Sequence, residues 1–290
     1  MIWKKRQYFI WLIPMLLFLV GLVVIPLVVT IIDSLYRVNL LDMNGRVFVG
    51  VQNYIKLFSD SNVIRSLVNT SFYVTVALIV ETFLGILVAV ALKEKFCLRG
   101  IIIAVLILPW ALPPIVNGIM WKLIFDPTIG MINSILMKTG IITGPFIWLN
   151  NPEISKICIV IVHIWRMLPL ISIIFLAKMQ TIPTEILEAA SLDGANKRGQ
   201  FFTMILPNIK SVLLITLSQG CIGAFHLFDE PYSMTGMASD TRSILIQDYL
   251  IAFREYELGK GMALAMVISI GLLGAMLLLG IMIKRGVSDA

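Results

Sequence analysis

Six long apolar segments constrain the fold of this 290-residue chain more than any other feature. A helix that crosses a lipid bilayer needs about 20 mostly apolar residues. Segments of about that length lie at 9–32, 66–92, 101–125, 157–177, 211–232 and 262–283. The sequence therefore predicts an all-α, polytopic membrane protein with six transmembrane helices.

The composition argues against soluble protein classes. Hydrophobic residues make up 59% of the chain, charged residues make up 14%, and the mean hydropathy is +0.94. Soluble domains have about 45–50% apolar and about 25% charged residues. The apolar runs are also too long for the alternating strands of an outer-membrane barrel. Because Cys97, Cys158 and Cys221 are far apart in the sequence, we expect neither a disulfide nor a metal site.

The distribution of Lys and Arg predicts which side of the membrane each loop occupies. With six spans, the termini and loops on one side of the membrane are 1–8, 93–100, 178–210 and 284–290. The other set is 33–65, 126–156 and 233–260. The first set has roughly twice the density of Lys and Arg, and the richer side is cytoplasmic. We therefore expect both termini inside, a first span that is kept rather than cleaved, and no nucleic-acid partner for the net charge of +6.

The inner spans carry features that are unusual for simple membrane anchors. Glu81 lies near the middle of the second span. The third to fifth spans are interrupted by Pro109, Pro113, Pro114, Pro169 and the stretch from Gly220 to Gly223. Such residues are tolerated at membrane depth where protein or a cavity satisfies the backbone. We expect these spans to surround a path or a packed interior.

The cytoplasmic loop 178–210 reads as two short helices joined by a turn. Thr184 is predicted to cap the first helix, and Gly194 is suited to end it in a left-handed conformation. Asn196 is predicted to cap a second helix that ends before Pro207.

Two acidic residues of this loop, Glu188 and Asp193, are then available to a partner protein. The alternative is an amphipathic connector that lies on lipid. The residues alone favour neither reading.

The loop also resembles the EAA loop of bacterial ABC importer permeases. The resemblance is carried by Glu188-Ala189-Ala190, Asp193-Gly194 and Ile205-Leu206-Pro207. In that family the loop forms a coupling helix that docks into a cleft of the cytoplasmic ATPase. The resemblance implies ATPase-coupling roles for Glu188, Ala189, Ala190, Asp193, Gly194, Leu206 and Pro207.

The resemblance extends over nearly the whole chain, to the carbohydrate-uptake permeases similar to the maltose and glycerol-3-phosphate permeases. It includes the stretch FVGVQNY at 48–54, Asn69-Thr70, the stretch LPWALPP at 108–114, Trp121, Gly130 to Asn133, Phe228-Asp229, Tyr232 and Thr235-Gly236. It implies the type I importer fold, with one permease domain over 1–290, core helices over 66–283 and the coupling loop at 178–210.

Membership of this family implies a complex in the bacterial or archaeal cytoplasmic membrane. The expected partners are a second related permease in a heterodimer, two ATPase subunits and an extracytoplasmic solute-binding protein. The chain itself is expected to be non-catalytic and to bind no cofactor or metal, with ATP and Mg²⁺ held by the ATPase. Its expected function is to form half of the translocation path for a sugar or oligosaccharide.

The fifth span suggests where substrate passes. On a helical wheel Gln219, Gly223, His226 and Glu230 fall within about 40° of one another. Such a stripe faces a cavity or a closely packed helix. The resemblance adds Gly220, Ala224 and Leu227 from this span, and Trp165, Arg166 and Met167 from the fourth. In the third span, Asn117 and Trp121 are spaced i, i+4 and could face the same path.

Several polar and aromatic residues of these spans could have a structural role instead of contacting the solute. Arg166 could form an ion pair, with Glu81 or with an acid of a partner subunit. Trp121 could be an interfacial anchor, and Lys122 is expected to extend toward the interface. For His163 we expect a buried histidine with satisfied hydrogen bonds.

The identity of the solute stays open at the sequence level. Arg166, His226 and Lys122 would give the path a cationic character that suits an acidic saccharide. The alternatives are an ABC permease for glycerol-3-phosphate or a polyamine, and a proton-coupled secondary transporter that uses Glu81. No metalloprotease-type or other catalytic motif supports a membrane-embedded enzyme.

Overall fold

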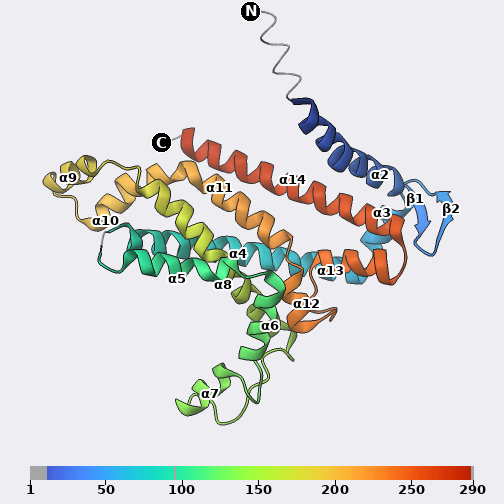
Figure 1. The fold of residues 1–290 in the computed structure, drawn as a ribbon, viewed down its shortest axis with the longest axis horizontal. Coiled ribbons are helices and arrows are strands. Elements are labelled where there is room, and N and C mark those ends of the chain that lie inside the picture. The colour runs from blue at the N-terminus through green and yellow to red at the C-terminus, as the bar shows by residue number, and fades with distance from the viewer. Residues whose placement is uncertain (1–11, 95, 289–290) are drawn as a thin grey trace, which may run out of the picture. The chain divides into compact units, whose positions relative to one another are not determined.

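The computed structural model describes residues 12–94 and 96–288 (Figure 1). The chain divides into two compact units, Met1–Ile64 with Gln247–Gly271 and Arg65–Ile246 with Leu272–Ala290. Apart from one β-hairpin, the regular elements of the described residues are helical. This agrees with the predicted class, although the hairpin was not predicted.

Helices long and apolar enough to cross a membrane occupy five of the six predicted positions. They comprise the stretch Leu12–Asp33, α4 (Ser61–Lys93), α8 (Pro152–Met179), the stretch Val212–Thr235 and α14 (Leu258–Ser288). Residues 9–11 of the predicted first span lie outside the described residues. The predicted locations of these spans are confirmed.

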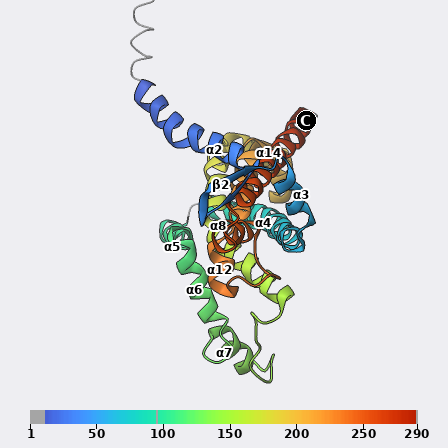
Figure 2. The ribbon, with the colours of Figure 1, turned by 90° about the vertical axis from the view of Figure 1, so that its right-hand side faces the viewer.

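The third predicted span is not one continuous helix. It is divided into α5 (Arg99–Ala111) and α6 (Pro114–Ile124), which are bent by 99° relative to one another (Figure 2). Leu112 between them has an extended conformation, with ψ 136°. A residue that precedes a proline is pushed out of the helical region, so Pro113 and Pro114 enforce the break. The six predicted spans therefore correspond to five long helices and one bent pair.

The first unit contains the end of the first span and the segment that follows it. The span includes a π-helical turn, η1 (Val20–Val24), followed by α2 (Ile25–Asp33). The strands β1 (Tyr36–Asn39) and β2 (Asp42–Phe48) pair antiparallel, and α3 (Gln52–Ser59) follows. The π-helical turn η3 (Leu250–Arg254) precedes α14.

The stretch FVGVQNY at 48–54 has a structural role in this unit. Gly50 adopts a positive φ of 56°, which favours glycine. The buried Asn53 Nδ2 donates to the backbone oxygens of Ser34, at 2.8 Å, and Tyr36, at 2.9 Å. The hydroxyls of Tyr54 and Ser34 are 2.7 Å apart. These bonds fix the chain where it leaves the first span.

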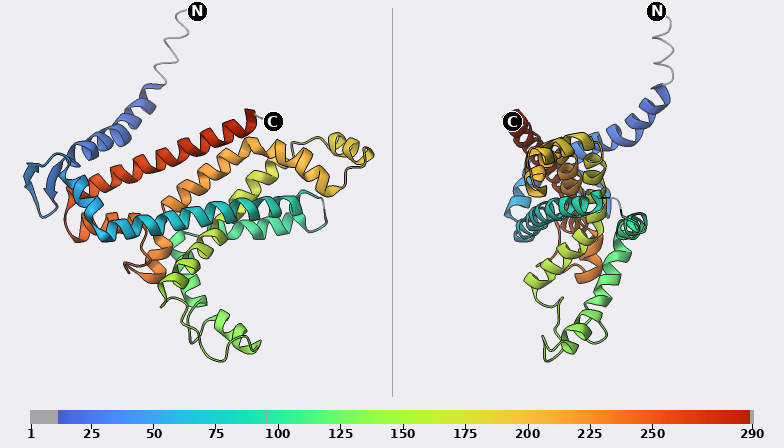
Figure 3. Two further views of the ribbon diagram at one scale, coloured as in Figure 1. Left: turned by 180° about the vertical axis from the view of Figure 1, so that it is seen from behind. Right: turned by 90° about the vertical axis from the view of Figure 1, so that its left-hand side faces the viewer.

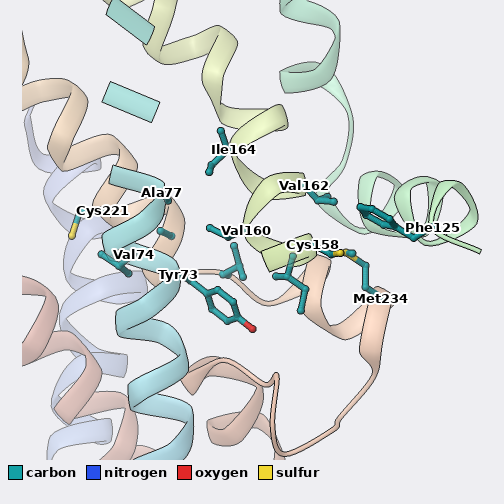
Figure 4. Close-up of a cluster of buried hydrophobic side chains, with 13 residues drawn as sticks. Tyr73, Val74, Ala77, Phe125, Cys158, Val160, Val162, Ile164, Cys221 and Met234 are labelled. Carbon is teal, nitrogen blue, oxygen red and sulfur yellow. The ribbon is translucent and has the colours of Figure 1, made fainter. Parts of the chain in front are cut away.

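The second unit is built around a hydrophobic core shared by several helices (Figure 4). Its buried side chains include Tyr73 and Ala77 of α4, Val160 and Val162 of α8, and Cys221 of α11 (Leu206–Phe225). α12 (Asp229–Thr235) packs against both α6 and α8. A second core joins the other ends of α4, α8 and α11.

Two loops of this unit are held by residues that carry the resemblance to carbohydrate-uptake permeases, namely Asn69-Thr70 and Asn133. Asn69 Nδ2 donates to the oxygens of Asp240 and Arg242, and the Ile244 amide donates to Thr70 Oγ1 at 2.8 Å, which positions the start of α13 (Ile244–Tyr249).

After α7 (Met131–Lys138) the chain returns toward Asn133. Asn133 Nδ2 donates to the oxygens of Pro127 and Phe146, and its Oδ1 accepts from Trp148 Nε1 at 2.9 Å. The residues singled out by resemblance here therefore act as loop anchors.

Candidate functional site

The cytoplasmic loop folds into two helices, as predicted, with two corrections. α9 (Thr184–Leu192) begins after Pro183, which occupies the N-cap position, so Thr184 is the first helical residue rather than the cap. Gly194 has φ 87° and confirms the left-handed turn. Asn196 caps α10 (Lys197–Gln200) by accepting a hydrogen bond from the Gly199 amide at 2.8 Å.

The second helix does not end before Pro207. It continues from α10 through the π-helical turn η2 (Phe201–Ile205) into α11. Pro207 follows directly after the π-helical turn η2, where the regular hydrogen-bond pattern of the helix is already interrupted, so the continuous helix accommodates it. The loop is thus joined to the fifth span by a continuous helical path (Figure 3).

The residues predicted to couple to an ATPase have different surroundings. Glu188, Ala189, Asp193, Gly194 and Pro207 are exposed, Leu206 is half-buried and Ala190 is buried. Two apolar side chains of α9 are exposed as well, Ile186 and Leu192, the latter to 89%. α9 therefore offers acidic and apolar groups to solvent on one short helix.

A hydrogen-bonded brace holds α9 against α10. Gln200 Nε2 donates to Ser191 Oγ at 2.7 Å and to the Ala195 oxygen at 3.2 Å. Ser191 Oγ in turn donates to the Leu187 oxygen at 2.9 Å. These bonds fix the angle of the turn at Gly194, and we call residues 184–205 the coupling segment.

An exposed ion pair connects the coupling segment to the end of α4. Lys197 Nζ lies 2.7 Å from Glu94 Oε1. The hydrogen bond and the positive charge of Lys197 lower the pKa of Glu94, and the same contact raises the pKa of Lys197. Both side chains are exposed, so solvent screens the attraction.

A second group of polar residues lies among the membrane-spanning helices, where Glu81, His163 and Glu230 are buried and Arg166 is half-buried. Arg166 Nε, on α8, donates to Glu230 Oε1 of α12 at 2.8 Å. From the sequence, an ion pair with Glu81 or with an acid of a partner subunit was the structural alternative for Arg166; the structure shows an ion pair, but with Glu230. The sequence could not show this because the two residues are 64 positions apart.

His163, one turn before Arg166, lies between two carboxylates. Its Nε2 is 3.6 Å from Glu81 Oε1, and its Nδ1 is 4.0 Å from Glu230 Oε1. Neither ring nitrogen has a hydrogen-bond partner among the described residues. His163 is buried as predicted, but the expectation that its hydrogen bonds are satisfied is wrong. We call Glu81, His163, Arg166 and Glu230 the buried charge cluster.

The polar stripe predicted for the fifth span is interrupted. α11 ends at Phe225, and Leu227 and Phe228 are not helical, so Glu230 lies on a separate helix. Gln219 and His226 are exposed. His226 Nδ1 lies 2.8 Å from the Ile222 oxygen.

The other residues assigned to this stretch face the interior of the second unit. Ala224 and Leu227 are buried in its core. A Cβ at Gly220 would lie 3.1 Å from Glu81 Oε2, and one at Gly223 would lie 3.3 Å from Met167 Cε. Glycine at these positions lets α11 approach α4 and α8 closely.

The candidates from the third and fourth spans also contact one another. Trp121 and Trp165 form an edge-to-face pair with ring centres 5.5 Å apart. Asn117 is buried and donates to the Val162 oxygen at 3.4 Å. α6 approaches α12 so closely that a Cβ at Gly118 would lie 1.9 Å from Ser233 Oγ. Neither Gly118 nor Ser233 was singled out from the sequence, because a single glycine in an apolar helix carries no distinctive signal.

Two hollows adjoin these residues. An apolar cavity of about 650 Å³ lies between α5 and α8 and is lined by Val105, Leu106, Leu108, Pro109, Ala111, Leu112, Trp165, Leu168 and Pro169. A more polar cleft of about 470 Å³ includes the exposed Lys122 together with Asn150, Thr235 and Asp240.

Comparison with known proteins defines the family. Residues 81–285 match the family described as "Binding-protein-dependent transport system inner membrane component". The chain is 32% identical to the trehalose/maltose transport system permease protein MalF of Thermococcus litoralis, covering 88% of this chain and 85% of that protein. It is 33% identical to the inner membrane ABC transporter permease protein YcjO of Escherichia coli, covering 91% and 90% of the two chains. This chain belongs to the family of membrane components of binding-protein-dependent transport systems.

The fold has a solved counterpart. A chain in the crystal structure of a bacterial ABC transporter involved in the import of the acidic polysaccharide alginate superposes with a TM-score of 0.85. The sequences are 18% identical, and the match covers 98% of each chain. The type I importer fold implied by the sequence is thus confirmed, and the chain is a multi-pass permease of an inner membrane.

Proposed function

We propose that this permease forms half of the translocation path of an ATP-driven importer for a sugar or oligosaccharide. The coupling segment is the observation that carries the proposal. It exposes Glu188 and Leu192 on the short helix α9 and Asp193 at the C-cap of that helix, and α10, to which α9 is braced, continues through η2 into the fifth span. Force applied to α9 by a partner would therefore be transmitted to α11.

The proposed assembly contains a second, related permease, two ATPase subunits and an extracytoplasmic solute-binding protein. ATP and Mg²⁺ would be bound by the ATPase, and this chain would contribute no catalytic group. Both termini and the coupling segment would be cytoplasmic, in accord with the distribution of Lys and Arg. Alternating access requires a bundle whose two states are biased by partner contacts.

A saccharide is the solute class that the relatives favour. The name of one relative refers to trehalose and maltose, and that of the fold counterpart refers to alginate. The proposed path residues are Asn117, Trp121, Trp165, Arg166, Met167, Gln219, Gly220, Gly223, Ala224, His226 and Leu227. Within this set, Gln219 and His226 are the exposed polar side chains, so they are the ones placed to contact a solute directly.

An acidic saccharide is a second candidate within the same function. Arg166 is committed to Glu230, so it does not provide a free positive charge. Lys122 is exposed and remains as a cationic group for the proposed path, and the exposed His226 is a further polar group. Lys122 lines the polar cleft, where it would meet a carboxylate that enters from outside.

Affinity purification of the tagged chain in mild detergent tests the assembly. We expect a second six-span permease and an ATPase to co-purify. The cognate binding protein is then titrated with a neutral maltooligosaccharide and with a uronate oligosaccharide of the same length. Tight binding of either defines the substrate class, whereas binding of a polyamine or glycerol phosphate in preference to both would overturn the saccharide proposal.

A further inference from the structure

The buried charge cluster contains one carboxylate more than its arginine can neutralise. Arg166 donates to Glu230 at 2.8 Å, and the Glu230 side chain is only 2% exposed. A bonded pair of opposite charges is far less unfavourable in a low-dielectric interior than an isolated charge. Glu230 and Arg166 therefore form a closed, ionised pair.

Glu81 has no comparable partner. The residue is 1% exposed, and neither of its carboxyl oxygens has a hydrogen-bond partner among the described residues. On one side α11 closes over it, since a Cβ at Gly220 would lie 3.1 Å from Glu81 Oε2. An ionised carboxylate here would be desolvated without a hydrogen bond from the described residues, which is unfavourable. The neutral, protonated carboxyl avoids this penalty.

His163 connects Glu81 to the ion pair. Its Nε2 faces Glu81 Oε1 at 3.6 Å, and its Nδ1 faces Glu230 Oε1 at 4.0 Å. A neutral imidazole has one N–H donor and one acceptor nitrogen. With the hydrogen on Nδ1, the ring turns its N–H toward the ionised Glu230 and its bare Nε2 toward the protonated Glu81, at separations longer than those of hydrogen bonds. The charged and titratable groups that face Glu81 are thus His163 and Arg166 from α8 and Glu230 from α12.

We propose that Glu81 is a proton-binding site of this permease, occupied in the conformation observed and linked to the Arg166–Glu230 pair through His163. The proton makes the contact between α4, α8, α11 and α12 electrically neutral. Its release leaves an uncompensated charge between these helices, so a rise in pH loosens their packing. This role is separate from the saccharide proposal and does not depend on the identity of the solute.

The sign of the pH dependence follows from linkage. In the unfolded chain Glu81 is ionised above about pH 4.3. At neutral pH the folded state then holds one more proton than the unfolded state, and stability falls as the pH rises. In the pH range in which Glu81 is protonated in the folded protein and ionised in the unfolded chain, each unit of increase in pH shifts the unfolding equilibrium toward the unfolded state by up to about tenfold.

The test compares thermal unfolding of the purified importer, in lipid nanodiscs, from about pH 6 to about pH 9, a range above the ordinary pKa of a glutamate. Glu81→Gln mimics the protonated carboxyl and should match the unchanged protein at the acidic end but lose its pH dependence. The control Glu153→Gln removes an exposed glutamate of α8 and should follow the unchanged protein. An unaltered pH dependence in Glu81→Gln would overturn the proposal.

A second measurement keeps the proposal testable if Glu81→Gln does not assemble. Infrared spectroscopy of the unchanged complex should detect a protonated carboxyl at neutral pH, through a carbonyl band that shifts in deuterated water. The band should disappear as the pH rises, in parallel with the fall in unfolding temperature. Absence of the band at neutral pH would overturn the proposal.

Discussion

The coupling segment and the buried charge cluster are both polar, but they are built in opposite ways. The coupling segment is exposed, and its brace joins residues close in sequence, such as Ser191 and Gln200. The buried charge cluster joins Arg166 to Glu230, which are 64 positions apart on different helices. Exposed polar groups can thus be positioned by local sequence, whereas polar groups buried between the helices depend on the whole fold.

The energetic consequences differ accordingly. Charges at the surface are hydrated and screened, so losing one contact there has little effect on stability. A charge between packed helices has no such compensation, and removal of its partner is strongly unfavourable. We therefore expect changes in the coupling segment to impair transport selectively, and changes in the buried charge cluster to impair the folded protein itself.

The largest loss of stability is expected for Arg166→Gln. It leaves Glu230 buried without its cation, a change that typically costs about 3–5 kcal/mol. Unfolding of the purified protein in detergent measures the effect. The double variant Arg166→Gln/Glu230→Gln removes both charges and should recover most of the loss. If the single variant were as stable as the unchanged protein, the ion pair would not be a structural element.

Glu188→Lys should have the largest effect on transport among changes in the coupling segment. It reverses the charge of an exposed α9 side chain at the proposed ATPase contact. Disruption of a charged interface contact costs about 2–5 kcal/mol, which is more than tenfold in binding. Binding-protein-stimulated ATPase activity should fall while membrane insertion is retained. Glu185→Lys, on the same helix, serves as the matched control; normal stimulation in Glu188→Lys would argue against a coupling role.

Gly118→Ala should destabilise the contact between α6 and α12. The added methyl group would lie 1.9 Å from Ser233 Oγ and 3.2 Å from the Glu230 Cα atom. Overpacking of this kind costs about 1–3 kcal/mol. Gly100→Ala on α5 is the control, since a Cβ there meets nothing within 4 Å and improves helix propensity. Equal stability of the two variants would show that α6 and α12 separate easily.

The smallest effect is expected for Glu94→Gln. The Lys197 hydrogen bond lowers the pKa of Glu94, so the pair contributes above the ordinary pKa of a glutamate and is lost as the pH falls through the lowered value. Both side chains are exposed, and we expect no measurable change in unfolding temperature near neutral pH. A clear loss of transport in this variant would show that the ion pair helps to position the coupling segment.

The sequence predicted those features that depend on local chemistry. Apolar length located the spans, and Gly194 and Asn196 marked the turn between α9 and α10 correctly. Thr184 was predicted to be the N-cap residue, but it is the first residue of α9, because Pro183 occupies the N-cap position. Continuation of α10 into α11 was missed because a π-helical turn before Pro207 lets the helix pass through the proline.

Contacts between residues on different helices could not be predicted from the sequence in the same way. The helical wheel grouped Glu230 with Gln219. However, helix α11 ends at Phe225, and the chain then changes direction so that Glu230 lies next to Arg166. Glu81 was recognised as unusual, yet its proximity to His163 depends on how α4 and α8 pack. The two proline residues at 113–114 indicated a break, but a 99° bend is a property of the folded surroundings.

The central claim is that this permease works in an ATP-driven importer, and reconstituted transport tests it most directly. The purified complex is placed in proteoliposomes with loaded binding protein outside and ATP with Mg²⁺ inside, and entry of the labelled saccharide is followed. The account predicts uptake that requires both ATP and the binding protein and that persists when an uncoupler removes the proton gradient. Uptake without ATP that collapses with the uncoupler would contradict the account and identify a proton-coupled transporter.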